Sequence, residues 1–294
     1  MYRSLNSYLQ QRFGCKVYKL ALRGGMTCPN RDGTCGTRGC IFCSGAGEFA
    51  AGGESIAEQL ENAKKRVADK IKDGKYIAYF QDYTNTYAPV SVLEPLFRAA
   101  IAPDDIAALS IGTRPDCLGE DVLALLEELS REKPVFVELG LQTIHESTAR
   151  YIRRGYDLPV FDRAVRELKA RGIEVVVHMI VGLPGETREM MRETARYIGQ
   201  SGADGIKIHL LHVLKGTDLA EEYEKGRVRT LEMDEYFEIL ADCLRVLPPE
   251  TVIHRLTGDG DKRTLLAPLW SADKKTVLNA MNRALAGIEQ GEEL

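Results

Sequence analysis

Four cysteines lie close together near the start of the chain, and their spacing suits a metal centre. Eleven residues separate Cys28 from Cys40, and two separate Cys40 from Cys43. The short interval lets two thiolates reach one metal centre, and the Gly-, Asn-, Asp- and Pro-containing segment before it can turn so that Cys28 becomes a third ligand. Three thiolates on a [4Fe–4S] cluster leave one iron open, whereas clusters that only carry electrons have four. The spacing therefore indicates a cluster with one iron available for chemistry.

A structural zinc site is the alternative that this segment leaves open. With Cys35 included there are four thiolates, which is enough for tetrahedral zinc. Zinc ribbons use two pairs of the Cys-x2-Cys type, however, and here Cys28 has no near partner while four residues separate Cys35 from Cys40. The spacing favours the iron–sulfur cluster over a non-catalytic zinc scaffold, with Cys35 as a further thiol of the loop.

Short apolar runs alternate with amphipathic segments along most of the chain. The runs predict six strands, at 16–22, 76–80, 107–111, 135–139, 175–181 and 205–211. The amphipathic segments predict five helices, at 56–71, 90–101, 121–131, 160–171 and 187–199. Alternating strands and helices predict an α/β fold with a parallel sheet and right-handed crossovers. Since a complete TIM barrel needs eight units, we expect a partial (β/α)6 barrel, with a doubly wound open sheet as the alternative.

The pattern divides the chain into three parts. Residues 1–15 are a basic N-terminal arm, residues 16–215 are the barrel, and residues 216–294 are a C-terminal extension. In the extension we expect a helix at 231–247, a strand at 252–254 and a last helix at 274–288. Because no Gly- or Ser-rich linker precedes it, the extension is expected to pack on the barrel.

Polar residues stand where the predicted strands end, and in parallel α/β folds these ends meet at one edge where chemistry is found. Lys207, His209 and His212 lie on the sixth strand or just beyond it, and His178 lies on the fifth. Several of these side chains should point into one substrate pocket, so we assign Lys207, His209 and His212 as catalytic. The residues of the extension that we expect to close this pocket are His254, Arg255 and Asp259.

Composition and charge limit the classes of protein to which the chain can belong. Of the 294 residues 44% are hydrophobic and 28% charged, which are the proportions of a soluble globular enzyme. The longest apolar stretch, 175–183, is too short to span a bilayer, and residues 1–13 lack the apolar region of a signal peptide. We expect a cytoplasmic protein without membrane contact. Six basic residues precede the first acidic one although the formal net charge is −4, so the N-terminal arm suits an anionic partner.

Several segments together resemble one group of radical S-adenosylmethionine (SAM) proteins, the YhcC/YtqA-like proteins, which are related to the radical SAM domain of the Elongator catalytic subunit. The segment GGMTCPNRDGTCGTRGCIFC at 24–43 is similar to their cluster loop. Further similar segments, spread over nearly the whole chain, are YIAYFQDYTNT (76–86), GTRPD (112–116), VELGLQT (137–143), GIKIHLLHVLKGT (205–217) and HRLTGD (254–259). DGKY at 73–76 and TGDG at 257–260 resemble the YtqA-like members more than the YhcC-like ones.

The resemblance implies a [4Fe–4S] cluster held by Cys28, Cys40 and Cys43, with Cys35 outside it, and SAM bound at the open iron. It implies that Phe42 lies beside the adenine and that Arg154, with Arg153 as its rival, binds the SAM carboxylate, for which a guanidinium is suited. The further residues assigned to SAM are Thr84 and Asn85 (amino group), Gln142 and Glu138 (ribose), Arg114 and Gly182. The chain lacks the Gly-Gly-Glu that commonly binds the SAM amino group, and it has Gly112 where many relatives have an acidic residue.

The resemblance also implies a substrate. YtqA-like members look like enzymes that act on the wobble uridine of tRNA, where they convert a carboxymethylaminomethyl group to aminomethyl before a separate methyltransferase acts. The implied partners are tRNA, an electron donor such as flavodoxin or ferredoxin, and a downstream tRNA methyltransferase. A radical SAM enzyme that modifies a small metabolite or a protein is the alternative.

Overall fold

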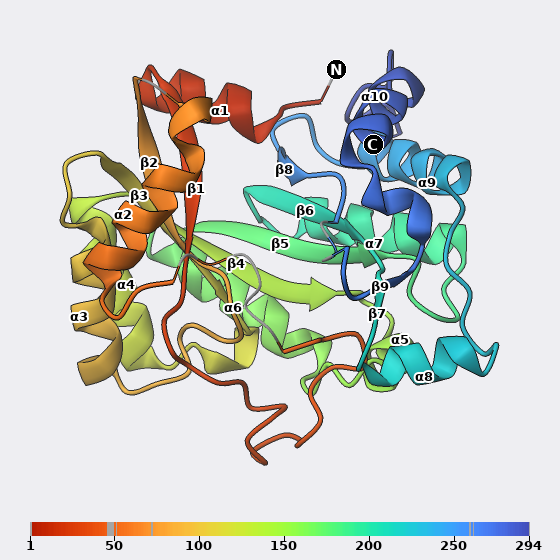
Figure 1. Ribbon diagram of the computed structural model, residues 1–294, viewed down its shortest axis with the longest axis horizontal. Coiled ribbons are helices and arrows are strands. Elements are labelled where there is room, and N and C mark those ends of the chain that lie inside the picture. Colours follow the sequence, from red (N-terminus) through yellow and green to blue (C-terminus); the bar gives the residue numbers. More distant parts are fainter. Residues whose placement is uncertain are drawn as a thin grey trace.

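The computed structural model describes residues 2–45, 50, 52–71, 73–258, 260 and 262–293, and in this part of the chain the centre is a curled parallel sheet of seven strands. The strands are β1 (Lys16–Leu22), β2 (Gly74–Phe80), β3 (Ile106–Thr113), β4 (Val135–Gln142), β5 (Glu174–Val181), β6 (Gly205–Leu210) and β8 (Val252–Arg255). They pair in chain order, each parallel to the next. The predicted α/β partial barrel of the TIM type is confirmed (Figure 1).

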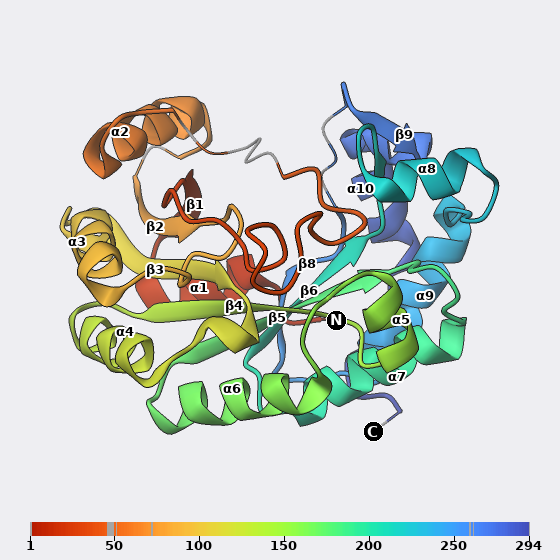
Figure 2. The ribbon, with the colours of Figure 1, turned by 90° about the horizontal axis from the view of Figure 1, so that it is seen from below.

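Amphipathic helices cover the outer face of the sheet (Figure 2). They are α2 (Ile56–Val67), α3 (Val90–Ile101), α4 (Glu120–Glu132), α6 (Leu158–Ala170) and α7 (Arg188–Gln200). Ser55 and Glu58 form a capping box at the start of α2, and the Thr187 hydroxyl accepts from the Met190 amide at the start of α7. Each helix buries an apolar stripe, which explains why the periodicity of the sequence located it.

Inside the curl, alternate strand residues form layers. Nearest the amino ends of the strands lies an apolar layer made of Val17, Ile77, Ala108, Phe136 and Val176. Leu9 of helix α1 (Leu5–Phe13) packs on this layer, so α1 closes that end of the barrel. Figure 1 shows α1 at the top and the loop after β1 at the opposite end.

Two segments are placed differently from expectation. The N-terminal arm forms α1, and Arg12 on it pairs with Glu174 of β5 and lies 5.7 Å from the centre of the Phe136 ring. The strand expected within the C-terminal extension joins the main sheet as β8, parallel to β6. The Ile253 amide of β8 also binds the N-terminal segment, since it donates to the Arg3 carbonyl at 2.8 Å. Both placements depend on contacts between the two ends of the chain, which local periodicity does not report.

The remaining elements surround the carboxyl end of the barrel and one of its sides. They are α5 (Glu146–Tyr151), α8 (Asp218–Glu224), α9 (Met233–Arg245), α10 (Lys274–Ala284) and the antiparallel pair β7 (Val213–Leu214) and β9 (Leu265–Ala267). The helix expected at 231–247 corresponds to α9 and the last helix to α10. None of the helices in the described part of the chain has the length and apolar character that crossing a membrane requires.

Candidate active site

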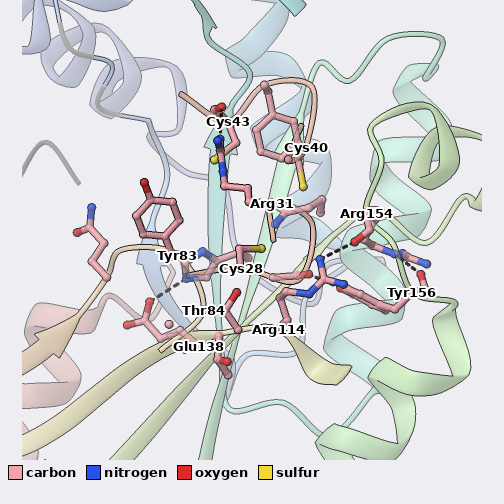
Figure 3. A pocket seen from close by; sticks show the side chains of 18 residues that line it. Cys28, Arg31, Cys40, Cys43, Tyr83, Thr84, Arg114, Glu138, Arg154 and Tyr156 are labelled. Atoms are coloured by element: carbon pink, nitrogen blue, oxygen red, sulfur yellow. Dashed lines mark hydrogen bonds and ion pairs between the residues drawn. The ribbon is translucent and has the colours of Figure 1, made fainter. Parts of the chain in front are cut away.

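A cavity of about 210 Å³ lies between the carboxyl ends of the strands and the loop of residues 23–45, here called the cysteine loop. Cys28, Cys40 and Cys43 all line it, whereas Cys35 is exposed and lies outside its lining. In Figure 3 Cys40 and Cys43 lie at one end of the cavity and Glu138 of β4 at the other. The three cysteines singled out by spacing therefore face one space, and the fourth does not.

The cysteine loop is attached to the turn that follows α5. The buried Asn30 side chain donates to the Arg153 carbonyl at 2.7 Å and lies 3.5 Å from the Cys40 sulfur. The Ile41 amide donates to the Ile152 carbonyl at 3.2 Å. Burial raises the pKa of the Cys40 thiol to about 11, an effect larger than the lowering by the Asn30 hydrogen bond and the nearby Arg114 charge. Within the described residues, no three His, Cys, Asp or Glu side chains converge on a point that would hold a single metal ion.

Arg31 holds the end of the loop that carries Cys43. Its guanidinium donates to the Cys43 carbonyl at 2.8 Å and lies over the Tyr83 ring at 5.8 Å. Gly39 and Gly45 have positive φ angles, and a Cβ at either position would come within 3.0 Å of the guanidinium. The two glycines are therefore required both by backbone conformation and by the space that Arg31 occupies.

Strained backbone gathers around the cavity. In the described part of the chain the non-glycine residues with left-handed φ are Tyr83 (58°), Gln142 (70°) and Arg153 (59°). Tyr83 and Gln142 line the cavity, and the Arg153 carbonyl accepts the hydrogen bond from the Asn30 side chain. Such conformations cost free energy and persist where surrounding contacts impose them, which is common at functional sites.

Glu138 and His178 line the inner end of the cavity and belong to a polar layer of the barrel. This layer is made of one interior residue from each of six strands: Lys19, Tyr79, Ser110, Glu138, His178 and Lys207, of which the other four contact Glu138 or one another behind the lining. Its centre is the Glu138 carboxylate, which is 1% exposed. Lys19 (2.5 Å) and the Ser110 hydroxyl (2.7 Å) donate to Oε1. His178 (2.8 Å) and Lys207 donate to Oε2. Four donors thus saturate one buried carboxylate.

Burial and the two ammonium groups set the protonation states of this layer. Burial by itself would raise the pKa of Glu138, but Lys19 and Lys207 hold it well below its usual range. Burial lowers the pKa of Lys207 to about 7 and, with Lys207 nearby, lowers that of His178 to about 4. Near pH 7 the layer therefore holds an ionised carboxylate and a neutral His178.

Comparison with known proteins identifies the family. The profile of the Radical SAM superfamily matches residues 33–198, and that of the Radical_SAM C-terminal domain matches residues 203–286. The protein YtqA of Bacillus subtilis (strain 168) is 48% identical over 287 residues, which cover 97% of this chain and 89% of YtqA. The chain belongs to the radical SAM superfamily. Its cofactors are therefore the [4Fe–4S] cluster and SAM that this superfamily uses.

Two further relatives extend this placement. Protein YhcC of Escherichia coli (strain K12) is 41% identical over 280 residues, covering 94% of this chain and 90% of YhcC, so the greater resemblance to YtqA is confirmed. A tRNA uridine(34) acetyltransferase of Methanocaldococcus jannaschii is 30% identical over 155 residues, covering 52% of this chain and 28% of that protein. The structure of Methanocaldococcus infernus Elp3 superposes with a TM-score of 0.69 at 18% identity, covering 93% of this chain and 64% of Elp3, which supports the fold.

The predicted SAM-binding residues of this radical SAM protein fall into two groups. Those that line the cavity are Phe42, Thr84, Arg114, Glu138, Gln142 and Arg154. Asn85 and Gly182 lie outside its lining. Asn85 is fully buried and donates to the Phe80 and Gly112 carbonyls, so it fastens the end of β2. Gly182 borders a separate cavity of about 150 Å³ with Met191 and Leu231.

The two arginines predicted to reach SAM are already engaged with protein groups. Arg154 donates to the Thr143 and Tyr156 carbonyls and to Glu146 at 2.7–2.9 Å, and it is 2% exposed. Arg114 is bidentate to Asp116 and donates to the Arg154 carbonyl at 2.8 Å. These bonds use three of the five N–H donors of each guanidinium, and a contact with SAM through the rest stays a prediction. The alternative, Arg153, pairs with Asp218 of α8 instead.

The predicted substrate-pocket residues are only partly brought together. Lys207 reaches the cavity floor through Glu138, and the His209 ring lies 5.0 Å from that of His178. His212 packs against Gly258 and Gly260, away from the cavity lining. His254 lies against the Phe136 ring, at the closed end, so its predicted place above the pocket is wrong. Asp259 lies outside the described residues.

Sequence reasoning missed Lys19, Tyr79 and Arg31. Lys19 and Tyr79 stand inside predicted strands, where an isolated polar residue is ordinary on a half-exposed face. The signal that could have found them is the alternation of side chains along a strand, in which every second residue points to the same face. Lys19 lies two residues after the interior Val17, just as Glu138 lies two residues after the interior Phe136.

Proposed function

We propose that this protein is a radical SAM enzyme that converts the carboxymethylaminomethyl group of a tRNA wobble uridine to aminomethyl. The observation that carries the proposal is that one cavity is lined by Cys28, Cys40 and Cys43 and, at the end away from Cys40 and Cys43, by the ionised Glu138 of the polar layer. A radical source and a charged substrate side chain can thus share one enclosed space. The choice of tRNA is supported by the resemblance to YtqA-like proteins and by the relative that bears the name tRNA uridine(34) acetyltransferase.

The residues at the cysteine end fit the cofactors. Cys28, Cys40 and Cys43 would hold the cluster, and the Thr84 hydroxyl, which is buried in the cavity wall and has no hydrogen-bond partner among the described residues, is a group that a ligand would satisfy. Phe42 and Gln142 would contact SAM from the same wall. When bound, the cluster and SAM supply a 5′-deoxyadenosyl radical. The protein's part is to hold the substrate near it and exclude water.

The proposed reaction breaks the bond between the amine nitrogen and the carboxymethyl carbon. The C–H bonds of that carbon are weakened by the nitrogen on one side and the carboxylate on the other, so a hydrogen atom is removed there. Loss of one further electron to a one-electron carrier and of one proton gives an imine. Addition of water then yields the aminomethyl group and a two-carbon aldehyde acid. The proposed carrier class is flavodoxin or ferredoxin, which also supplies the electron that starts the reaction, and a methyltransferase would act on the product.

Two experiments test the proposal separately. Anaerobic reconstitution with iron, sulfide, SAM and a reductant should yield 5′-deoxyadenosine, and zinc without iron would overturn the enzymatic assignment. Mass spectrometry of tRNA nucleosides from a strain that lacks this protein should show accumulated carboxymethylaminomethyl uridine. An unchanged nucleoside profile, in a strain with no redundant route, would reject tRNA and favour a small metabolite or a protein as substrate.

A further inference from the structure

We propose that Lys19 and Lys207 bind the carboxylate of the substrate side chain at the floor of the cavity, with Glu138 as the positioning residue that holds both ammonium groups. This inference rests on the proposed function, and it adds the basis of substrate selection. It concerns recognition of an anionic group and involves no covalent step.

The polar layer holds more basic than acidic side chains. The polar layer places two lysines on one buried carboxylate, with His178 as a neutral donor. When both lysines are protonated, one positive charge is in excess in this layer, and because the pKa of Lys207 is about 7, an anion bound beside it would favour that state. Arg255 of β8, which pairs in register with Lys207, adds to the positive potential felt by Lys207. Because buried charge is costly unless it is paired, a group that carries one negative charge is the ligand that this floor favours.

Within the described residues, both lysines of the polar layer have hydrogen-bonding capacity beyond their protein contacts. Both lysines flank the Tyr79 ring, at 4.8 Å for Lys19 and 4.4 Å for Lys207. Lys207 uses two of its three N–H donors, on Glu138 and on the Tyr79 hydroxyl at 3.0 Å. Lys19 donates to Glu138 and reaches Ser110 only at 3.4 Å. Each ammonium thus keeps a donor for a ligand while Glu138 and Tyr79 fix its position.

The polar layer lies at the inner end of the cavity. The Glu138 and His178 side chains line the cavity, and the apolar layer capped by α1 lies directly behind them. A side chain that enters from the cysteine end therefore presents its terminal group to the polar layer. The terminal group of the carboxymethylaminomethyl substrate is a carboxylate, whereas that of the aminomethyl product is an ammonium, which two lysines repel. The same layer would hold the substrate and release the product.

The experiment measures binding of the reconstituted protein to synthetic anticodon stem–loops that carry carboxymethylaminomethyl uridine, aminomethyl uridine or uridine. The wild-type protein should bind the first about 10- to 100-fold more tightly than the second, the range for one charge-assisted contact. Lys19→Met should bring this ratio close to one, and Lys19→Arg should restore most of it. Lys16→Met, on the same strand but with its ammonium on the Lys70 carbonyl, is the matched control and should keep the wild-type ratio.

Iron and sulfide content and thermal unfolding show whether each variant is folded. Lys19→Met is the lead variant because Lys207 still pairs with Glu138 and His178 still donates to it, and because the Lys19 side chain is 18% exposed. An unchanged ratio in a folded Lys19→Met protein, or no preference in the wild type, overturns the inference. Conversion is measured separately by mass spectrometry, so conversion without a lysine-dependent preference refutes only the inference. Preference without conversion refutes only the proposed reaction.

Discussion

The barrel interior has two adjacent layers that are built on the same strands and have opposite character. On five strands, the residue two positions after a member of the apolar layer belongs to the polar layer. The pairs are Val17 and Lys19, Ile77 and Tyr79, Ala108 and Ser110, Phe136 and Glu138, and Val176 and His178. The apolar layer is covered by Leu9 of α1, and the polar layer opens on the cavity beside the cysteine loop.

The two layers separate the part of the barrel that stabilises the fold from the part that borders the proposed site. The apolar layer needs only close packing, so it can be sealed at the amino ends of the strands. The polar layer needs ion pairs and hydrogen bonds for every buried group, and it leaves a charge for a ligand to complete. Substitutions in the two layers should therefore separate folding from function, as parallel barrels generally do between their two ends.

The largest effect on activity is expected from substituting the cysteines that line the cavity. Cys28→Ala, Cys40→Ala or Cys43→Ala should abolish both iron loading and SAM cleavage, because each removes one of three thiolates. Cys35→Ala is the matched control, since Cys35 is exposed outside the cavity, and it should still cleave SAM. Iron and sulfide analysis and 5′-deoxyadenosine assays report the result. Equal losses in all four variants would instead support a site of four thiolates.

Truncation in the apolar layer should affect stability and spare recognition. Phe136 is 1% exposed, so Phe136→Ala should lower the free energy of unfolding by about 3–5 kcal/mol through lost burial and a cavity. Urea unfolding of the cofactor-free protein measures the change. The folded variant, assayed at low temperature, should keep the wild-type preference between stem–loops. A lost preference would show that the two layers are coupled.

A nearly isosteric change in the polar layer should alter substrate recognition more than it lowers stability. Glu138→Gln keeps the shape but removes the charge that holds Lys19 and Lys207, and we expect a smaller loss of stability, about 1.5–3 kcal/mol. The discrimination between carboxymethylaminomethyl and aminomethyl stem–loops should change. A variant with wild-type discrimination would remove Glu138 from its positioning role.

Acid should weaken the polar layer by a smaller amount. The pKa of His178 in the folded protein is lowered to about 4, below the roughly 6.5 of an unfolded chain, so the unfolded state takes up a proton first as the pH falls. Stability is thus lost from about pH 6.5 downward, by about 2 kcal/mol at pH 5 for this histidine. Urea unfolding at pH 7 and pH 5 measures it. His178→Asn should reduce this pH dependence by that amount, and identical slopes would contradict the assignment.

The smallest effect is expected at the closed end of the barrel. Arg3, Arg12 and Lys16 belong to the basic N-terminal region whose charge suits an anionic partner, but Arg12 pairs with Glu174 and packs beside Phe136, far from the cysteine loop (Figure 1). Neutralising all three should leave the salt dependence of tRNA binding unchanged. A log–log slope that falls by roughly 0.7–0.9 for each residue would show that they do contact phosphates.

The sequence by itself determined most of the regular structure and the nature of the reaction centre. Hydrophobic periodicity located the strands and the outer helices because each element buries one face against the same sheet. The spacing of Cys28, Cys40 and Cys43 singled out the three thiols that line the cavity, because they lie within one loop. Local information sufficed where neighbours in sequence are neighbours in space.

Only the tertiary structure decided which side chains share the polar layer. Lys19 and Lys207 reach Glu138 from 119 and 69 residues away, and closure of the curled sheet brings them together. Thr84 and Asn85 are adjacent at one strand end, yet Thr84 lines the cavity, whereas Asn85 lies outside the lining and donates to the Phe80 carbonyl. Periodicity gives the face of a strand on which a residue lies, but the curvature of the sheet and the packing of α1 and β8 decide which interior residues meet.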